Sequence, residues 1–365
     1  MKYYVQQIAS YYLRNLVPEP EAGSVTVDRD FLQGFDIEEF RDGYLTLLRL
    51  VRSMYTDVMN EPGAFGMPLM EAVEENSKST NYTKSHDGFK RIPHILLILG
   101  VAGKITANMT LTVSGGDLIT VAKSVKLVKM PEMLNKLKDY GFEITGFTKQ
   151  VKEGDALTVS YPDCRAVLPV LKSMADAQSI IAKGDIRRNN AYFYMMMPDI
   201  LKSSKVKEPV LTFGDMYRAL NDNNREIAVI FNECIGNKAK VKFRTIDFMR
   251  NRWHGVYTGI KSKQVLCTIK NEHDDLSVKM NLEHIGTYMD TVMALPEGLQ
   301  KEIRENAWNC NQSQCNPKCA GGFKFEMDGE KYSKCRGGAF TFTNIAPDDA
   351  EHLKLLLEHE MKREV

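Results

Sequence analysis

The chain has 365 residues, of which 43% are hydrophobic and 26% are charged, and its formal net charge at pH 7 is +1. This composition is ordinary for a globular protein and allows two or three domains, each with its own hydrophobic core. The near-neutral charge excludes a strongly basic surface over the whole protein, so contact with nucleic acid would have to be made by a local patch.

Neither a membrane span nor an export signal is expected. The longest strongly apolar run, IPHILLILGVAG from Ile92, is about half the roughly 20 residues of a membrane helix. The first residues, MKYYVQQIASYYLRNL, mix Tyr, Gln and Arg and lack the apolar core of a signal peptide. We therefore expect a cytoplasmic protein, in which clustered cysteines bind metal more often than they form disulfides.

Residues 1–85 are predicted to form an N-terminal helical region and a linker. Asp36 can cap a helix, and Glu39 stands three residues later, at the spacing of a capping box. Apolar side chains then recur at helical spacing: Phe40, Tyr44, Leu47, Leu48, Val51 and Met54. From Asn60 to Gly88 the chain is rich in Gly, Pro, Ser and Asn, which predicts a flexible connection or flap.

Residues 86–180 are predicted to form a winged-helix-like domain. A buried helix at 89–105 is followed by a short strand at 109–115, helices at 116–125 and 130–141, and a hairpin of two strands, at 142–151 and 155–162, around the turn KEGD. Helix, strand, helix, helix, hairpin is the order of a winged helix-turn-helix. Many small α/β modules, however, repeat this order without contacting DNA.

Lysines are concentrated in this block. Between Thr120 and Lys152 there are seven lysines and three acidic residues, a local excess of four positive charges that would suit phosphate groups. The candidate nucleic-acid residues are Lys123, Lys126, Lys129, Asn135, Lys136, Lys138, Lys149 and Lys152. The third helix contains no arginine to read bases, and lysines on solvated surfaces are common, so an ordinary charged surface is the alternative.

Residues 181–300 are predicted to form a domain with an antiparallel sheet and helices. A helical segment begins near Phe213, three strands follow in meander order at 254–260, 265–271 and 276–282, and a helix at 282–294 closes the domain. Trp253, His254 and Tyr257 stand at the start of the first strand and form a candidate pocket. A histidine at the surface or at the edge of the core is the alternative, because one His without a partner is not a site.

Residues 301–365 contain four cysteines, Cys310, Cys315, Cys319 and Cys335, spaced C-x4-C-x3-C-x15-C. The segment between the last two predicts a tight hairpin around Asp328–Gly329, which would return Cys335 to the side of Cys319. Four thiolates suit tetrahedral Zn²⁺ and leave no position for water, so the zinc would be structural. An iron–sulfur cluster is the alternative, although the spacing does not match ferredoxins, and disulfides would fit an exported protein.

A helix is predicted after this module, with Pro347 in its first turn and Asp348 and Asp349 near its positive end. Ala350, Leu353, Leu357 and Met361 form one apolar stripe along it. The remaining cysteines, Cys164, Cys234 and Cys267, lie in or beside apolar stretches and are predicted to be buried, inert thiols.

The last third of the chain resembles an uncharacterised family of bacterial hypothetical proteins that end in a cysteine-rich module. The resemblance rests on the run beginning at Trp253, on the four cysteines and on the Leu-rich acidic helix that follows. It implies a bacterial cytoplasmic setting and a metal bound at the four cysteines, and it implies no activity. The preceding sheet also resembles, in outline, the YjbR-like α/β domains.

These patterns predict a multidomain α+β protein with a helical N-terminus, a winged-helix-like middle, an antiparallel sheet with helices and a C-terminal zinc-binding hairpin module. The first hypothesis for its function is a regulator, in which the middle block binds DNA and the sheet domain senses a ligand or partner. The second is an enzyme with a pocket near His254 and a purely structural zinc module. The third is a scaffold whose zinc module docks a partner protein.

Overall fold

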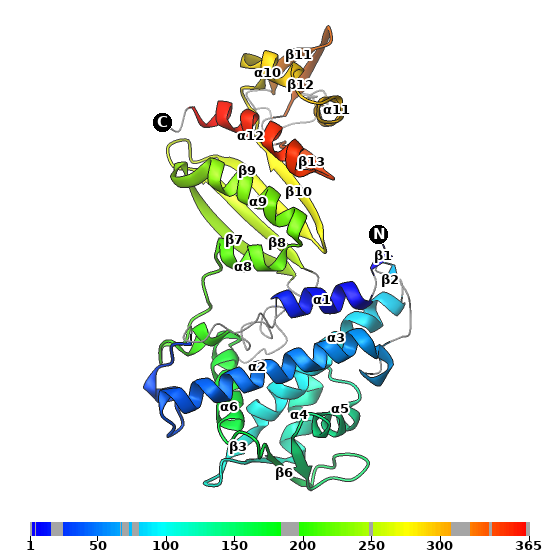
Figure 1. The fold of residues 1–365 in the computed structure, drawn as a ribbon, viewed down its shortest axis with the longest axis vertical. Coiled ribbons are helices and arrows are strands. Elements are labelled where there is room, and N and C mark those ends of the chain that lie inside the picture. Colours follow the sequence, from blue (N-terminus) through cyan, green and yellow to red (C-terminus); the bar gives the residue numbers. More distant parts are fainter. Residues whose placement is uncertain are drawn as a thin grey trace, which may run out of the picture. The chain divides into compact units, whose positions relative to one another are not determined.

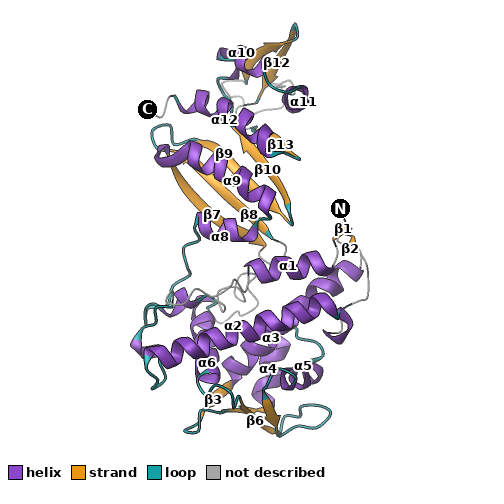
Figure 2. Ribbon diagram, viewed as in Figure 1, coloured by secondary structure: helices purple, strands orange, loops and turns teal. Residues whose placement is uncertain are grey.

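The computed structural model describes residues 2–3, 5–15, 25–65, 67, 73–74, 80–183, 197–247, 251–307, 322–335 and 338–362. The chain is a mixed α+β protein, as predicted (Figure 2). It divides into two compact units, residues 1–210 and 211–365. The finer division into four parts stays a prediction.

Unit 1 is built around long helices. They are α1 (Val5–Asn15), α2 (Ile37–Asn60), α3 (Thr80–Ala102) and α6 (Val167–Ile181), joined by short 3-10 turns and a two-strand ladder of β1 (Lys2–Tyr3) and β2 (Val73–Glu74). The predicted cap of α2 is confirmed, since the Asp36 carboxylate accepts a hydrogen bond of 2.9 Å from the Glu39 amide. Glycines allow close helix packing: a Cβ at Gly43 or Gly100 would come within 2.8 Å of an alanine Cβ on or beside α6.

A proline inside α3 explains one buried hydrogen bond. Pro93 lacks an N–H, so the carbonyl four residues earlier, at Phe89, has no helical donor. The hydroxyl of Tyr55 on α2 donates to that carbonyl at 3.1 Å. Tyr12 of α1 stacks on the Phe89 ring, with centroids 4.9 Å apart, so the three helices meet at this point.

The second half of unit 1 contains the block predicted to be DNA-binding. Its elements are β3 (Gly103–Ile105), β4 (Leu111–Ser114), α4 (Gly115–Ser124), α5 (Met130–Lys138), β5 (Glu143–Thr145) and β6 (Ala156–Ser160). The four strands form an antiparallel sheet in the order β3-β4-β6-β5. Of the two strands between α3 and α4, β4 pairs with β6, the last strand of the hairpin, and β3 pairs with β4.

Several boundaries differ from the prediction, and residues 103–105, expected at the end of the buried helix, form strand β3. Helix α3 begins at Thr80, inside the stretch expected to be a flexible connection. The hairpin strands are shorter than predicted, because Gly146 has φ +90° and a Cβ there would lie 2.1 Å from the Ala156 carbonyl oxygen. The chain leaves the ladder at that glycine, and residues 146–155 form a long loop instead of a tight turn.

Unit 2 contains a five-stranded antiparallel sheet in the order β13-β10-β9-β8-β7. Its strands are β7 (Ala239–Asp247), β8 (Arg252–Gly259), β9 (Val265–Glu272), β10 (Asp275–Met280) and β13 (Phe340–Thr343). The three meander strands expected from the sequence are β8, β9 and β10. Strand β13 comes from the C-terminal segment and pairs with β10, so that segment completes the sheet.

Helices cover one face of this sheet. Figure 1 shows α8 (Phe213–Ala219) and α9 (Asp222–Ile235) lying across it. The terminal helix α12 (Pro347–Met361) packs on α9 and β9. Its start and its apolar stripe are as predicted, with the side chains at positions 350, 353, 357 and 361 fully buried.

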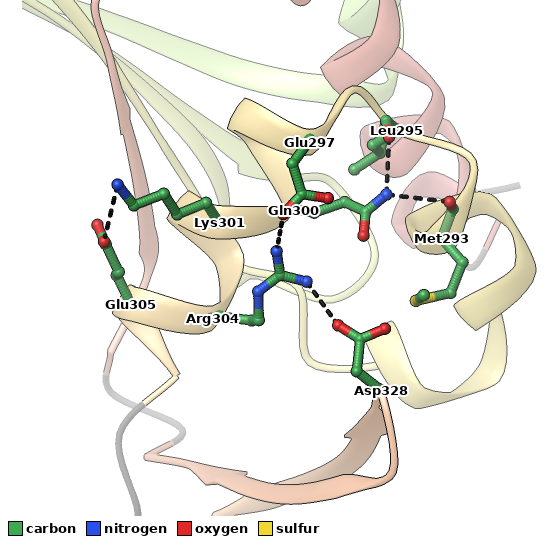
Figure 3. Close-up of polar contacts among 8 residues, drawn as sticks. All are labelled: Met293, Leu295, Glu297, Gln300, Lys301, Arg304, Glu305 and Asp328. Atoms are coloured by element: carbon green, nitrogen blue, oxygen red, sulfur yellow. Dashed lines mark hydrogen bonds and ion pairs between the residues drawn. The ribbon is translucent and has the colours of Figure 1, made fainter.

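The remaining elements lie between β10 and β13. They are a 3-10 turn (Ile285–Thr287), α10 (Met289–Met293), α11 (Glu297–Asn306) and the predicted hairpin of β11 (Phe323–Met327) and β12 (Glu330–Lys334). Arg304 of α11 bridges Glu297 and the hairpin residue Asp328, the latter at 2.6 Å (Figure 3). The Gln300 amide donates to the carbonyls of Met293 and Leu295, which fixes the connection from α10 to α11 (Figure 3).

In the described part of the chain, every helix is too short or too polar to span a bilayer.

Candidate nucleic-acid interface and cysteine residues

The structure places the eight candidate nucleic-acid residues on α4, α5 and their two neighbouring loops. Lys123 is in the last turn of α4, Lys126 and Lys129 lie between α4 and α5, and Lys149 and Lys152 are in loop 146–155. The other three, Asn135, Lys136 and Lys138, belong to α5. Lys136 is half-buried, and the remaining seven side chains are exposed.

The connection between α4 and α5 is a sharp turn that contains two left-handed lysines. The amide of Lys126 donates to the Lys123 carbonyl at 3.1 Å, and that of Leu127 donates to the Ala122 carbonyl at 2.9 Å, the pattern of a Schellman motif. Lys126 has φ +55° and Lys129 has φ +60°, where glycine is the usual residue. Helix α5 begins at Met130, directly after the second of these lysines.

Two lysines of α5 are partly engaged by the protein itself. The Lys136 ammonium lies 3.1 Å from Asp139 and over the rings of Phe65 and Tyr140. Lys138 lies 5.2 Å from the ring centre of Phe147, a residue of loop 146–155. Lys136 is therefore less available to a ligand than the sequence suggests, whereas Lys138 links α5 to the loop and stays exposed.

Loop 146–155 is anchored to the start of α4. The amides of Gly115 and Gly116 donate to the carbonyls of Asp155 and Glu153, at 2.8 and 3.1 Å. A Cβ at Gly115 would lie 2.0 Å from the Lys152 carbonyl oxygen, so only glycine allows this approach. The position of Lys152 is thereby fixed relative to α4.

Of the four cysteines predicted to bind metal, Cys335 lies in the described part of the chain and is half-buried at the end of β12. Cys310, Cys315 and Cys319 lie outside the described residues, so the predicted tetrad stays a prediction. Within the described residues, no three His, Cys, Asp or Glu side chains gather as metal ligands.

Lys334, next to Cys335, is a buried lysine. Its ammonium donates to the Asn306 carbonyl and lies 5.0 Å from the ring centre of Phe340. Burial lowers the pKa of Lys334, and the Cys335 thiol acts in the opposite direction. The end of the hairpin is thus fixed to α11 and β13, directly beside Cys335.

The prediction of a buried thiol is confirmed for one of the other three cysteines. Cys267 is fully buried, and Cys164 and Cys234 are half-buried. Burial raises the pKa of Cys234 to about 11 and raises that of Cys267 further. Because a thiolate is the reactive form, the thiols of Cys234 and Cys267 are poor nucleophiles at neutral pH.

The three residues of the candidate pocket do not share one side of the sheet. Trp253 and Tyr257 are fully buried on the face covered by helices, where the Tyr257 hydroxyl donates to Asn232 of α9 at 3.1 Å. His254 points to the opposite face, because successive residues of a strand alternate. Burial, followed by the positive charges of Lys270 and Arg244, lowers the pKa of His254 to about 4.

The face that carries His254 is rich in basic residues, which the sequence reasoning missed. We call it the basic sheet face and define it by Lys240, Lys242, Arg244, Arg252, His254, Lys270 and Lys279. The sequence of β7, AKVKFRTID, contains the pattern of such a strand, because its basic residues occupy alternate positions. Reading this stretch as a strand would have placed Lys240, Lys242 and Arg244 on one face.

No family model, no curated protein and no solved structure matches this chain. The functional proposals below therefore rest on the residues and their geometry.

Proposed function

We propose that residues 80–160 form a winged helix-turn-helix that binds DNA, and that the protein is a cytoplasmic regulator. The order α3, β3, β4, α4, α5, β5, β6 contains the series helix, strand, helix, helix, hairpin, with β3 as an additional strand, and this order supports the proposal together with the pairing of β4 with β6. In such a fold the third helix enters the major groove and the loop of the hairpin contacts the backbone beside it. Here these parts are α5 and loop 146–155.

The observation that carries the proposal is the distribution of lysines. Six of the seven lysines between residues 120 and 152 are exposed, and they lie on α4, on α5 and on the two loops next to them. Lysines placed around one helix and its adjoining loop suit contacts with successive phosphates. Asn135 on the exposed side of α5 is a candidate for hydrogen bonds to a base, for which asparagine suits adenine.

Unit 2 would supply the sensing part of the regulator. We propose that Cys310, Cys315, Cys319 and Cys335 hold one structural Zn²⁺, because four thiolates are the donor set that this ion prefers. The hairpin β11–β12 consists of two strands of five residues each, and a metal would add stability to this small element.

The test is the salt dependence of DNA binding by the full chain. The slope of log K against log salt concentration should fall by about 0.9 for each phosphate that the protein no longer neutralises. We expect Lys138→Ala/Lys149→Ala to lower the slope by about 1.8, and to weaken binding to all sequences alike. Fluorescence anisotropy of a labelled duplex, measured over a series of KCl concentrations, gives the slope.

A matched control is Lys205→Ala/Lys207→Ala, which removes the same charge from exposed positions of unit 1 outside the block. The control should keep the slope of the unaltered protein. A chain that binds no duplex at low salt, or a slope that falls equally in both variants, would exclude the winged-helix interface.

A further inference from the structure

The basic sheet face carries many more positive than negative charges. Its cations come from three neighbouring strands and from β10, and its described acidic side chains are Glu272 and Asp275. Glu272 is already paired with Arg252 at 2.8 Å. The surface therefore keeps a positive excess at neutral pH without counting His254.

The cations lie in adjacent positions across the strands. Arg244 is the register partner of His254, and His254 is the partner of Lys270. Lys279 of β10 stands diagonally next to Lys270, since its own partner is Thr268. Side chains that face each other in this way have Cβ atoms about 5 Å apart.

This arrangement costs the sheet stability. His254 is neutral at pH 7, so the like charges that repel each other are the diagonal neighbours Lys270 and Lys279, whose long side chains are within reach of one another. After burial, the nearby amino group of Lys279 is the largest cause that lowers the pKa of Lys270. An anion bound between these side chains would remove the repulsion, and this relief would favour its binding.

The side chains of the face favour phosphates over bases as a ligand. The aromatic side chains Trp253, Tyr257, Phe340 and Phe342 all lie on the opposite face under the helices, so they are unavailable for stacking. The same face carries the hydroxyls of Thr258, Thr268, Ser277, Thr341 and Thr343, together with the half-buried Val256 and the exposed Val265. Hydroxyls and cations on an extended surface suit a chain of phosphates.

We propose that the basic sheet face is a second, sequence-independent binding surface for the phosphate backbone of DNA. The identity of the ligand rests on the proposed function of unit 1, but none of the residues is shared with it. Arg244, Lys270 and Lys279 contact phosphates, Lys240 and Lys242 extend the contact along β7, and hydroxyls between them donate further hydrogen bonds.

The test uses four forms of the full chain: unaltered, Lys138→Ala/Lys149→Ala, Lys270→Ala/Lys279→Ala, and all four substitutions together. We expect the sheet-face double variant to lower the slope of log K against log salt by about 1.8 on a random-sequence duplex. The fourfold variant should lower the slope by the sum of both effects. Because like charges are removed, the sheet-face variant should be at least as resistant to heat as the unaltered protein.

The matched control is Lys354→Ala/Lys362→Ala, which removes two lysines from α12 and its C-terminal end, on the other side of the sheet. A second measurement follows the NMR titration of His254, identified by the absence of its signal in His254→Gln. Bound phosphates should raise its pKa from about 4 toward its ordinary value.

The outcomes separate the two proposals. If the sheet-face variant keeps the full slope while the α5 and loop variant has a reduced one, this inference is overturned and the winged-helix proposal stands. The reverse result supports the sheet face and overturns the winged helix. If poly-glutamate binds as tightly as the duplex, and Lys270→Ala/Lys279→Ala abolishes that binding, the assignment to nucleic acid is overturned. A duplex that leaves the His254 titration unchanged would overturn the inference.

Discussion

The carboxylate of Glu360 is enclosed where α12 meets the segment before α10. One oxygen accepts hydrogen bonds from the His284 amide at 2.9 Å and from the Tyr288 hydroxyl at 2.6 Å, and the other lies 2.8 Å from His284 Nδ1. Burial, and then the charge of Glu360, raise the pKa of Tyr288 well above its usual range, so that this phenol remains a donor. One side chain thus ties the last helix to the chain that follows β10.

We expect Glu360→Ala to lower the free energy of unfolding of unit 2 by about 3 kcal/mol, because the buried Tyr288 hydroxyl and the part-buried His284 would lose this carboxylate as a partner. Urea unfolding followed by tryptophan fluorescence measures the change, since Trp253 and Trp308 both belong to unit 2. Glu358→Ala removes the same charge from an exposed position of the same helix and should change little. Similar decreases in both variants would contradict the role of Glu360.

Some single-residue features could be predicted from the sequence and others could not. The Asp36 cap and the turn at Asp328–Gly329 were predictable, because short polar side chains and glycine have strong local preferences. The engagement of Lys136 by Phe65 was not, because Phe65 comes from a distant part of the chain. Long-range contacts decide how available a side chain is, and a local pattern does not contain them.

At the scale of elements, the loop of the β5–β6 hairpin depends on its contact with α4. We expect Gly115→Ala to displace the loop, because the new Cβ would meet the Lys152 carbonyl at 2.0 Å, and to destabilise unit 1 by about 1–3 kcal/mol. Gly116→Ala is the matched control, since its Cβ would find its nearest neighbour at 3.5 Å. Circular dichroism during urea unfolding measures both. Equal stability of the two variants would show that the loop is not held there.

The strands that were predicted and those that were missed differ in their surroundings. Strands β8, β9 and β10 alternate between buried apolar and half-buried polar residues, which is the signal of a sheet with one covered face. Strand β7 alternates apolar and basic residues, so its pattern was present in the sequence and was overlooked. Strand β13 is four residues long and far from β10 in sequence, so pairing across the sheet, more than local preference, makes this segment a strand.

At the scale of the whole molecule, the order of the chain predicted the α+β class, while the division into two units depends on contacts that no local pattern records. The segment after residue 300 illustrates this. Its sequence suggested a separate module, yet β13 completes the sheet and α12 covers it. The metal proposed at Cys310, Cys315, Cys319 and Cys335, which flank the hairpin β11–β12, would therefore act on the stability of the sheet itself.

We expect Cys319→Ser to release about one equivalent of zinc and to lower the melting temperature of unit 2 by roughly 6–12 °C, as a destabilisation of about 3 kcal/mol would do. Elemental analysis of protein purified without added zinc, together with the fluorescence melting curve, measures both effects. Cys164→Ser in unit 1 serves as the control. Protein that contains no zinc, or that contains iron with visible absorbance, would contradict the zinc assignment.

The left-handed lysines between α4 and α5 have a consequence for directed evolution. A non-glycine residue in that conformation lowers the free energy of unfolding by about 1 kcal/mol, so glycine at positions 126 and 129 would give a more heat-stable protein. A library selected for heat resistance alone should accumulate those glycines, whereas a library selected for the proposed DNA binding should keep the lysines. The two selections would diverge at this turn.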